Sequence, residues 1–285
     1  MPGDPVYAML GGDITQEQYD MAYKEMNLDK PIYLRYVNWC ADLIKGDFGK
    51  SYKYRMPVID LIKTRLPVTM YLGGLSIIIS TAVGILFGIL AATKRGKILD
   101  TVITFLANLG AVMPLFWLAV LGMSLFAMHL KWLPSYGFTF PTEDFVKSVR
   151  QTILPVIALS VGAIASTTRQ MRSSMLEVIQ QDYIRTARAK GLKESRVISK
   201  HALKNALIPI VTLTGMSFRN VVSGSASIEI IFSIAGTGQL LVTSVLSKDV
   251  ATTQACILIV AIVVSIANLI VDISYGYLDP RIRIQ

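Results

Sequence analysis

The sequence predicts an all-α protein that crosses a membrane several times. Hydrophobic residues make up 53% of the 285 positions, the mean hydropathy is +0.52, and only 16% of residues are charged, against about 25% in typical soluble domains. The apolar residues are concentrated in runs long enough to cross the roughly 30 Å hydrocarbon core of a bilayer. Five such spans are predicted, with a mixed N-terminal region before them and a basic segment between the third and the fourth.

The N-terminal region, residues 1–66, is comparatively polar and balanced in charge. Its stretch "ITQEQYDMAYKEMN" has helix-forming composition, with Thr15 as the N-cap. The following "PIYLRYVNWCADLIKGDFG" predicts a second helix, ended by Gly46 and Gly49. The Tyr, Trp and Leu side chains of this second helix suit a surface that lies against a membrane or another subunit.

The predicted spans cover residues 66–93, 102–128, 153–168, 206–223 and 253–273. In the first, Gly84 and Gly88 form a small-xxx-small pair that permits close approach of another helix. Pro114 breaks the second span, and Pro155 starts the third. Between the last two spans, "IEIIFSIAGTGQLLV" is apolar but interrupted by glycines, so we expect a re-entrant or interfacial element there.

Lys and Arg are concentrated in the loop after the first span, in the loop after the third span and at the C-terminus. The positive-inside rule places these segments in the cytosol. This topology accounts for the net charge of +9 better than a nucleic-acid-binding role does, because no basic motif with interleaved aromatic residues is present. We therefore expect an extracytoplasmic region 1–66, a transmembrane domain 67–276 with a cytosolic loop 169–204, and a cytosolic tail 277–285.

The number of spans raises a further expectation. Five spans with a cytosolic C-terminus leave residues 1–66 outside, and the sequence has no leader segment to carry them across. Either a long N-terminal tail crosses unaided, or a span upstream of Met1 is missing from this sequence. We favour the missing span.

The basic loop contains "DYIRTARAKGLKESRVISKHALKN", residues 182–205, which predicts two short helices. Tyr183, Ile184 and Ala187 share one face of the first helix. Its alanines are small enough to let the helix enter a groove of another protein, and Gly191 ends the helix as a left-handed cap. On the second helix a basic stripe follows, formed by Lys193, Arg196, Lys200 and Lys204. The alternative is an ordinary basic loop lying at the lipid headgroups.

"DYIRTARAKGL" followed by "HALKNALIPIVT" resembles the cytoplasmic loop of ABC importer permeases of the dipeptide/oligopeptide/nickel subfamily. The resemblance extends over nearly the whole chain. Further motifs in the same order are "PGDPV" at 2–6, "GDFGKSY" at 46–52, "RLPVTMYL" at 65–72, "FWLA" at 116–119 and "VDISYGYLDPRIR" at 271–283. This resemblance implies the type I ABC importer transmembrane fold. Family members normally have another span before the "PGDP" segment.

The resemblance implies a permease subunit of an ATP-driven importer in the bacterial cytoplasmic (inner) membrane, most simply for di- or oligopeptides. Nickel, metal chelates and glutathione are alternative cargoes. The implied partners are a second homologous permease, two ATPase subunits that carry Mg-ATP, an extracytoplasmic substrate-binding protein and membrane lipid. The chain itself would hold no cofactor and would not be an enzyme. In this family the basic loop docks into the ATPase, a role that would belong here to Asp182, Tyr183, Arg185, Ala187 and Gly191.

Three polar residues of the fourth predicted span and the segment after it, Arg219, Asn220 and Glu229, are candidates for the translocation pathway. A charged group within a span costs roughly 2.5–3.5 kcal/mol on insertion scales unless it faces water or a partner. Arg219 could therefore meet a substrate carboxylate, or it could form a structural pair with Glu229. Many relatives carry small or apolar residues where this chain has Arg219 and Asn220.

Two other functional classes are disfavoured. An ion-coupled secondary transporter would need buried acidic groups on paired half-helices, and only Glu229 and Asp272 are candidates. A membrane-embedded enzyme would need a nucleophile with a base, or a metal-binding set, and His129 and His201 have neither the spacing nor the acidic partners. Co-purification with an ATPase would distinguish an importer from a secondary transporter.

Overall fold

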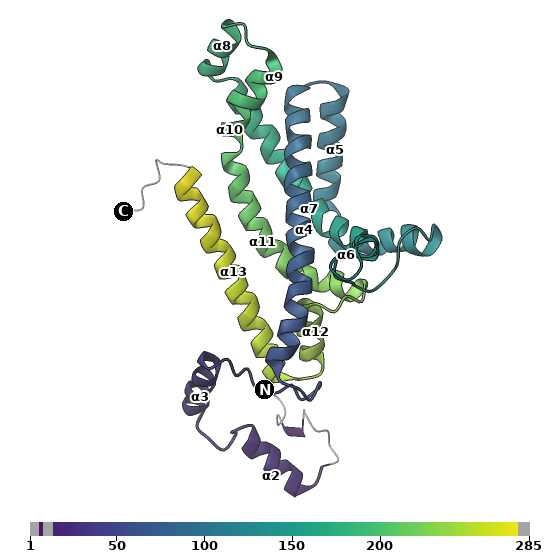
Figure 1. The fold of residues 1–285 in the computed structure, drawn as a ribbon, viewed down its shortest axis with the longest axis vertical. Helices are drawn as coiled ribbons and strands as arrows, with labels where there is room; N and C mark the ends of the chain where they lie inside the picture. Colours follow the sequence, from purple (N-terminus) through teal and green to yellow (C-terminus); the bar gives the residue numbers. More distant parts are fainter. Residues whose placement is uncertain (1–5, 8–13, 279–285) are drawn as a thin grey trace.

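The computed structural model describes residues 6–7 and 14–278 as an elongated assembly of helices (Figure 1). No strand occurs among these residues, where a single antiparallel bridge pairs Lys50 with Pro57. The long helices run between two ends. The end with α8, α9 and α10 is called the basic end, and the end with α2, α3 and α12 the opposite end (Figure 1).

Two helices form the N-terminal region at the opposite end. Helix α2, Gln16–Glu25, begins at Thr15, whose hydroxyl accepts a hydrogen bond from the amide of Gln18 at 3.3 Å. The Gln18 side chain in turn accepts one from the Thr15 amide at 3.1 Å, which confirms the predicted cap as a capping box. Helix α3, Ile32–Ile44, is followed by Gly46 in the left-handed conformation (φ 81°), as predicted.

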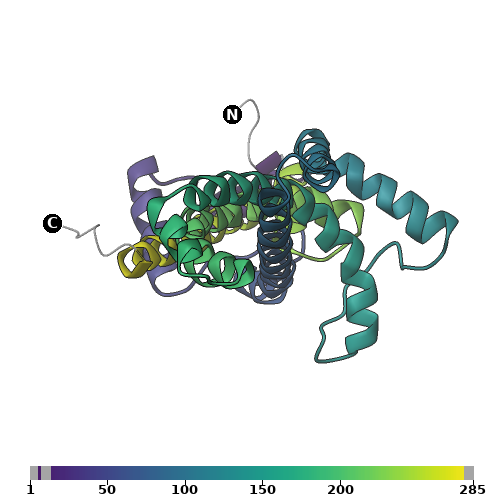
Figure 2. The same cartoon turned by 90° about the horizontal axis from the view of Figure 1, so that it is seen from above.

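The long helices are α4 (Val58–Thr93), α5 (Ile98–Val112), α7 (Phe145–Ile179), α11 (Ile208–Ile231) and α13 (Val250–Leu278). Helix α6, Leu115–Gly122, continues as the π-helix η1, Met123–His129. Helix α12, Thr237–Leu246, is the short apolar element expected between the last two spans. Viewed from above, α6 and the start of α7 extend away from the main bundle (Figure 2).

The predicted count of five spans is not confirmed. Among the described residues, three helical segments are long and apolar enough to cross a membrane: α4, α7 and residues 250–270 of α13. A fourth crossing is available if the pair formed by α5 and α6–η1 counts as one span, but the chain bends by 104° at Pro114. The described apolar part of α11, Ile208–Ser217, is shorter than a full span.

The helix that contains the third predicted span is longer than that span at both ends. Helix α7 starts at Phe145 and not at Pro155, and its N-cap is Asp144, whose carboxylate accepts a hydrogen bond from the amide of Lys147 at 2.9 Å. Pro155 lies inside the helix, where packing against neighbouring helices offsets its missing N–H donor. The helix also continues beyond Thr168 to Ile179, because leaving the apolar region does not require a helix to end.

Helices α4 and α7 form the centre of the bundle and pack closely through small residues. A Cβ atom added at Gly84 would lie 2.6 Å from the Cβ of Thr167, and one added at Gly88 would overlap Met171. Nearer the opposite end of the pair, the Ser160 hydroxyl donates to the backbone carbonyl of Ser76 at 3.2 Å. The predicted close approach at Gly84 and Gly88 is therefore confirmed, with α7 as the partner helix.

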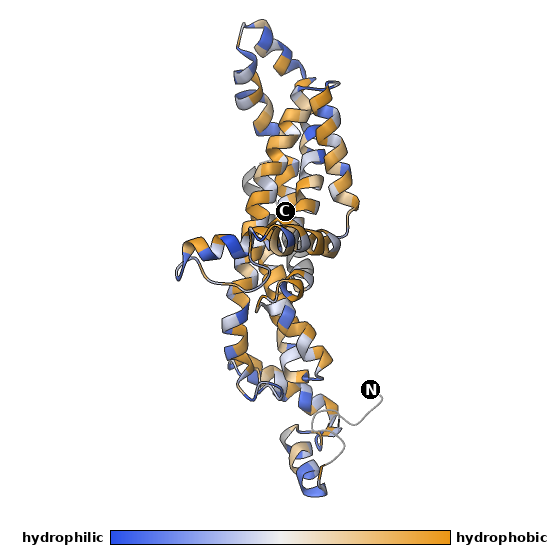
Figure 3. Ribbon diagram, turned by 90° about the vertical axis from the view of Figure 1, so that its right-hand side faces the viewer, coloured by the Kyte–Doolittle hydropathy of each residue, from blue (hydrophilic) through white to orange (hydrophobic). Residues whose placement is uncertain are grey.

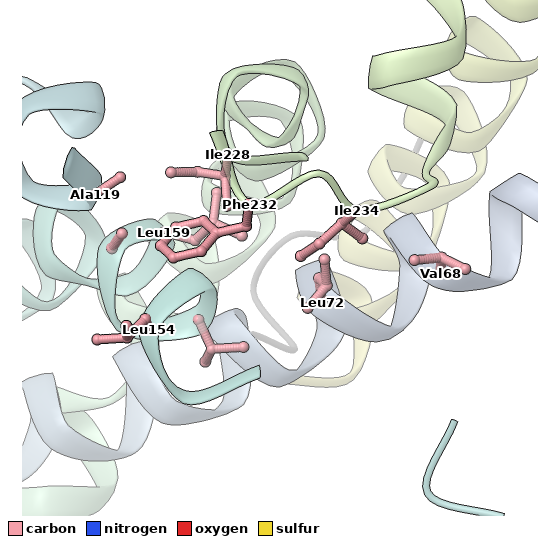
Figure 4. Close-up of a cluster of buried hydrophobic side chains, with 10 residues drawn as sticks. Val68, Leu72, Ala119, Leu154, Leu159, Ile228, Phe232 and Ile234 are labelled. Atoms are coloured by element: carbon pink, nitrogen blue, oxygen red, sulfur yellow. The ribbon is translucent and has the colours of Figure 1, made fainter. Parts of the chain in front are cut away.

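A cluster of buried apolar side chains joins four helices near the opposite end (Figure 4). Leu72 of α4, Leu159 of α7 and Ile228 of α11 are members, and Phe232 and Ile234 follow α11 in the turn toward α12. Hydrophobic residues predominate along the long helices, whereas hydrophilic residues gather toward the two ends and on the segment that projects sideways from the bundle (Figure 3). The apolar cluster packs α11 and the turn toward α12 against α4.

Candidate functional site

At the basic end, residues 182–206 form a compact projection, called the α8–α10 segment. It comprises α8 (Asp182–Ala189), α9 (Glu194–Arg196), the π-helix η2 (Val197–Ala202) and α10 (Leu203–Ala206). Gly191 follows α8 with φ +74°, a conformation that favours glycine, so the predicted left-handed cap is confirmed. The segment therefore has the predicted two-part plan, with its second part irregular.

The inner face of α8 is anchored to its own chain. Ile184 is fully buried and Ala187 nearly so. Both belong to an apolar cluster with Met171 and Met175 of α7 and Val197 of η2. Ala187, one of the residues predicted to contact the ATPase, therefore packs against this chain, and its role in that contact stays a prediction. Helix α8 is therefore packed against the end of α7.

The outer face of α8 is polar and open. The side chains of Asp182 and Arg185 are 97% and 74% exposed and form an ion pair of 3.5 Å. Tyr183 is also exposed, and its hydroxyl accepts a hydrogen bond from Nδ2 of Asn205 at 2.7 Å. Of the five predicted contact residues, Asp182, Tyr183, Arg185 and Gly191 are thus on the surface, and only Ala187 is inside.

An ion pair across the Gly191 turn was missed by the sequence analysis. Arg188 donates from Nε and Nη2 to the two carboxylate oxygens of Glu194 at 3.1 and 2.7 Å. This pairing holds the end of α8 against the start of α9, and Arg188 holds the pKa of the Glu194 carboxyl below its usual range. The two residues are not at helical spacing, so periodicity gave no signal for the pair.

The predicted basic stripe on the second helix remains accessible although the helix is not regular. Lys193, Arg196, Lys200 and Lys204 are all exposed. The π-helix η2 changes the turn between them, so the spacing expected for a straight α-helix does not hold. The stripe and the outer face of α8 both lie in the α8–α10 segment at the basic end.

A second missed pair joins α5 to α7 near the basic end. Arg172 donates from Nε and Nη2 to the two oxygens of Asp100 at 2.7 and 2.8 Å. Asp100 is nearly buried and also accepts hydrogen bonds from the Gly96 amide and the Thr104 hydroxyl. The pair therefore attaches the turn between α4 and α5 to the part of α7 that carries α8.

At the opposite end, Glu229 is fully buried and bridges three helices. Its carboxylate accepts a hydrogen bond from the Thr69 hydroxyl of α4 and one from the Gln239 amide of α12, each at 2.7 Å. The Thr69 oxygen accepts in turn from the Thr237 amide at 2.8 Å. Gly236 lies directly against the Glu229 carboxyl, where any Cβ would overlap it. The Glu229 carboxyl thus satisfies a backbone amide at the N-terminus of α12, an end of a helix where acidic groups are favoured.

The other two pathway candidates are only partly described. Arg219 and Asn220 lie in α11, and their side chains fall outside the described part of the structure, as does that of Asp272 in α13. The hydrogen bonds of Glu229 connect it to α4 and α12. A place for these residues on a translocation pathway stays a prediction. Within the described residues, no group of three or more His, Cys, Asp or Glu side chains is placed to hold a metal ion.

Several helices of membrane-spanning length and apolar composition are typical of a polytopic membrane protein. Residues 84–284 match the family model described as "Binding-protein-dependent transport system inner membrane component". The chain belongs to this family. This confirms the family resemblance, and the chain is the permease subunit of an ABC importer.

Named relatives cover almost the whole chain. The chain is 38% identical over 285 residues to the oligopeptide transport system permease protein AppB of Bacillus subtilis (strain 168), an alignment covering 99% of this chain and 90% of the relative. It is 39% identical over 283 residues to a putative peptide transport system permease protein of Brucella abortus (strain 2308), with the same coverage.

Solved structures share the fold at lower identity. A chain of the MetNI methionine ABC transporter, in an inward-facing conformation, superposes with a TM-score of 0.64 and 18% identity, covering 78% of this chain and 97% of that one. A chain of an amino acid ABC transporter with histidines gives a TM-score of 0.59 and 14% identity, covering 77% and 94%. The expected type I ABC importer fold is therefore confirmed.

Proposed function

We propose that this permease imports di- or oligopeptides and supplies half of the translocation pathway. The relatives that match 99% of the chain at 38–39% identity carry peptide or oligopeptide permease names. Nickel, metal chelates and glutathione are the alternative cargoes. Arg219, Asn220 and Glu229 are the proposed polar residues of the pathway, and Glu229 contributes by holding α12 in place.

The α8–α10 segment is the proposed contact with the ATPase subunits, which bind and hydrolyse Mg-ATP. The observation that carries this proposal is that α8 has one buried face and one exposed face. Ile184 and Ala187 are buried on α7, while Asp182, Tyr183 and Arg185 face outward. A helix anchored in this way transmits a displacement at its outer face to α7, and through Gly84 and Gly88 to α4.

In the proposed topology the basic end and residues 277–285 face the cytosol, and residues 1–66 lie outside the bacterial inner membrane. The support is the concentration of Lys and Arg at the basic end. The chain itself carries no cofactor in this scheme and catalyses no reaction.

A second homologous permease is the proposed partner within the membrane, and an external binding protein delivers the substrate. The exposure of α13 supports a second permease as a partner, because only 17% of the most apolar stretch of this helix is buried by this chain. An apolar groove of 650 Å³ opens between α4, α11 and α13, lined by residues such as Ile77, Val211 and Ile266. Lipid and a second subunit are the two kinds of neighbour that suit such a surface in a membrane.

The test is co-purification of the tagged permease with the products of its neighbouring transporter genes, expressed together. Wild type is expected to recover an ATPase and a second permease, and Arg185→Glu to lose the ATPase but keep the second permease. Arg95→Glu reverses an exposed charge at the same end but outside the α8–α10 segment, and should lose neither. Equal ATPase recovery with both variants would contradict the proposed contact, and failure of wild type to recover any ATPase would contradict the importer assembly. Uptake of radiolabelled dipeptide into proteoliposomes then tests the cargo.

A further inference from the structure

Helix α3 presents a broad apolar face that nothing in the described part of the chain covers. At 100° per residue, Ile32, Tyr33, Tyr36, Val37 and Ile44 fall within one arc of about 140°. Their exposed fractions lie between 59% and 88%. The other side of the helix carries polar residues, namely Arg35, Asn38, Asp42 and Lys45. A surface of this kind on a folded protein marks a contact with another body.

Helix α3 lies beside the point where the apolar segment of α13 begins. The apolar segment of α13 begins at Val250. Val250, Ala251 and Gln254 line a 510 Å³ pocket together with residues of α3 that include Ile32, Arg35, Tyr36 and Trp39. The chain after α3 is also tied to this point, since the Ser51 hydroxyl donates to Asp249, which caps the start of α13 through the Thr252 amide. Figure 1 shows α3 beside this end of α13.

We propose that α3 lies in the membrane–water interface, with its apolar face resting on the lipid. At 13 residues the helix is about 20 Å long, too short to span a bilayer. Its Tyr and Trp residues are the types that gather at the interface, and an apolar face opposite a polar one is the pattern of helices that lie in that plane. Ile257, in the apolar segment of α13 that follows Val250, is also exposed, as expected for a helix that faces lipid.

This inference rests on the proposed topology, in which residues 1–66 lie outside the membrane. In this arrangement α3 anchors the N-terminal region to the outer surface of the membrane, beside the permease. A helix bound to the lipid holds α2 and the 49–57 turn at a constant distance from α4 and α13. An external protein that docks there would then meet a surface that is already in position.

The test is collision spectroscopy of a nitroxide spin label on the complete importer in liposomes. The label is placed at Val37→Cys or, as a matched control one residue away on the polar side, at Asn38→Cys. Both carry Cys40→Ser, whereas Cys256 is fully buried and is left in place. Oxygen, which partitions into lipid, and a water-soluble nickel chelate are the two collision reagents. Both label sites are exposed, so neither change disturbs the packing of the chain.

The label at Val37 is expected to collide several-fold more with oxygen than with the nickel chelate, and the label at Asn38 to show the reverse. Nickel-dominated collisions at both positions would place α3 in water, and shielding of the Val37 label from both reagents would mean that a protein covers it. Either result overturns the inference. Peptide uptake by the same liposomes is measured in parallel. Normal uptake with a water-exposed α3 would refute only this inference, whereas absent uptake in wild type would refute the proposed cargo.

Discussion

Replacing Asp100 by Asn tests whether the ion pair with Arg172 holds the basic end together. The variant keeps the size of the side chain but removes the carboxylate, whose two oxygens accept hydrogen bonds of 2.7 and 2.8 Å from Arg172. Breaking a fully buried pair costs 3–5 kcal/mol, and an exposed pair contributes about 0–1 kcal/mol. The Asp100 side chain is 8% exposed and that of Arg172 is 30% exposed, so a loss of about 2 kcal/mol is expected.

The assay is hydrogen exchange of the Gly96 amide, which donates to Asp100 at 3.1 Å and reports local opening of the α4–α5 turn. A loss of about 2 kcal/mol corresponds to exchange that is ~30-fold faster. Lys97→Gln is the matched control, because Lys97 lies in the same turn and its side chain makes no capping hydrogen bond. Equal exchange in Asp100→Asn and Lys97→Gln would refute the reasoning, because the pair would then contribute nothing beyond a surface contact.

Two further changes test the packing of the bundle. Gly88→Val should lower the yield of folded permease and its melting temperature in detergent, because the added carbons overlap α7 and overpacking costs about 1–3 kcal/mol or more. Gly74→Ala, where no atom lies within 4 Å of the added Cβ, should behave as wild type, and similar losses in both would contradict the close approach. Thr69→Val should destabilise the protein by about 1–3 kcal/mol, because it leaves the carboxylate of Glu229 and an amide of α12 each one hydrogen bond short. Thr64→Val, which removes only bonds to backbone carbonyls in the first turns of α4, is the control, and equal melting temperatures would count against the buried junction.

Glu229 illustrates how a correct signal in the sequence can indicate more than one role. An acidic residue in an apolar segment is rare and predicts a functional or a structural partner. The residues that bind it, Thr69 and Gln239, are ordinary polar residues with no distinguishing motif. Thr69 is 160 residues away in the chain. Only the packing of α4, α11 and α12 shows that the carboxylate caps a short helix.

The sequence by itself determined the all-α class, the approximate places of the apolar helices, the cap at Thr15, the stop at Gly191 and the family. These features follow from local rules, because hydrophobic periodicity, capping residues and glycine conformations act over a few neighbouring positions. The tertiary structure alone decided the 104° bend at Pro114, the inward orientation of Ala187 and the pairing of Asp100 with Arg172, which are 72 residues apart. Such features depend on which distant surfaces meet. That choice is made by the summed packing of whole helices, and no short stretch of sequence encodes it.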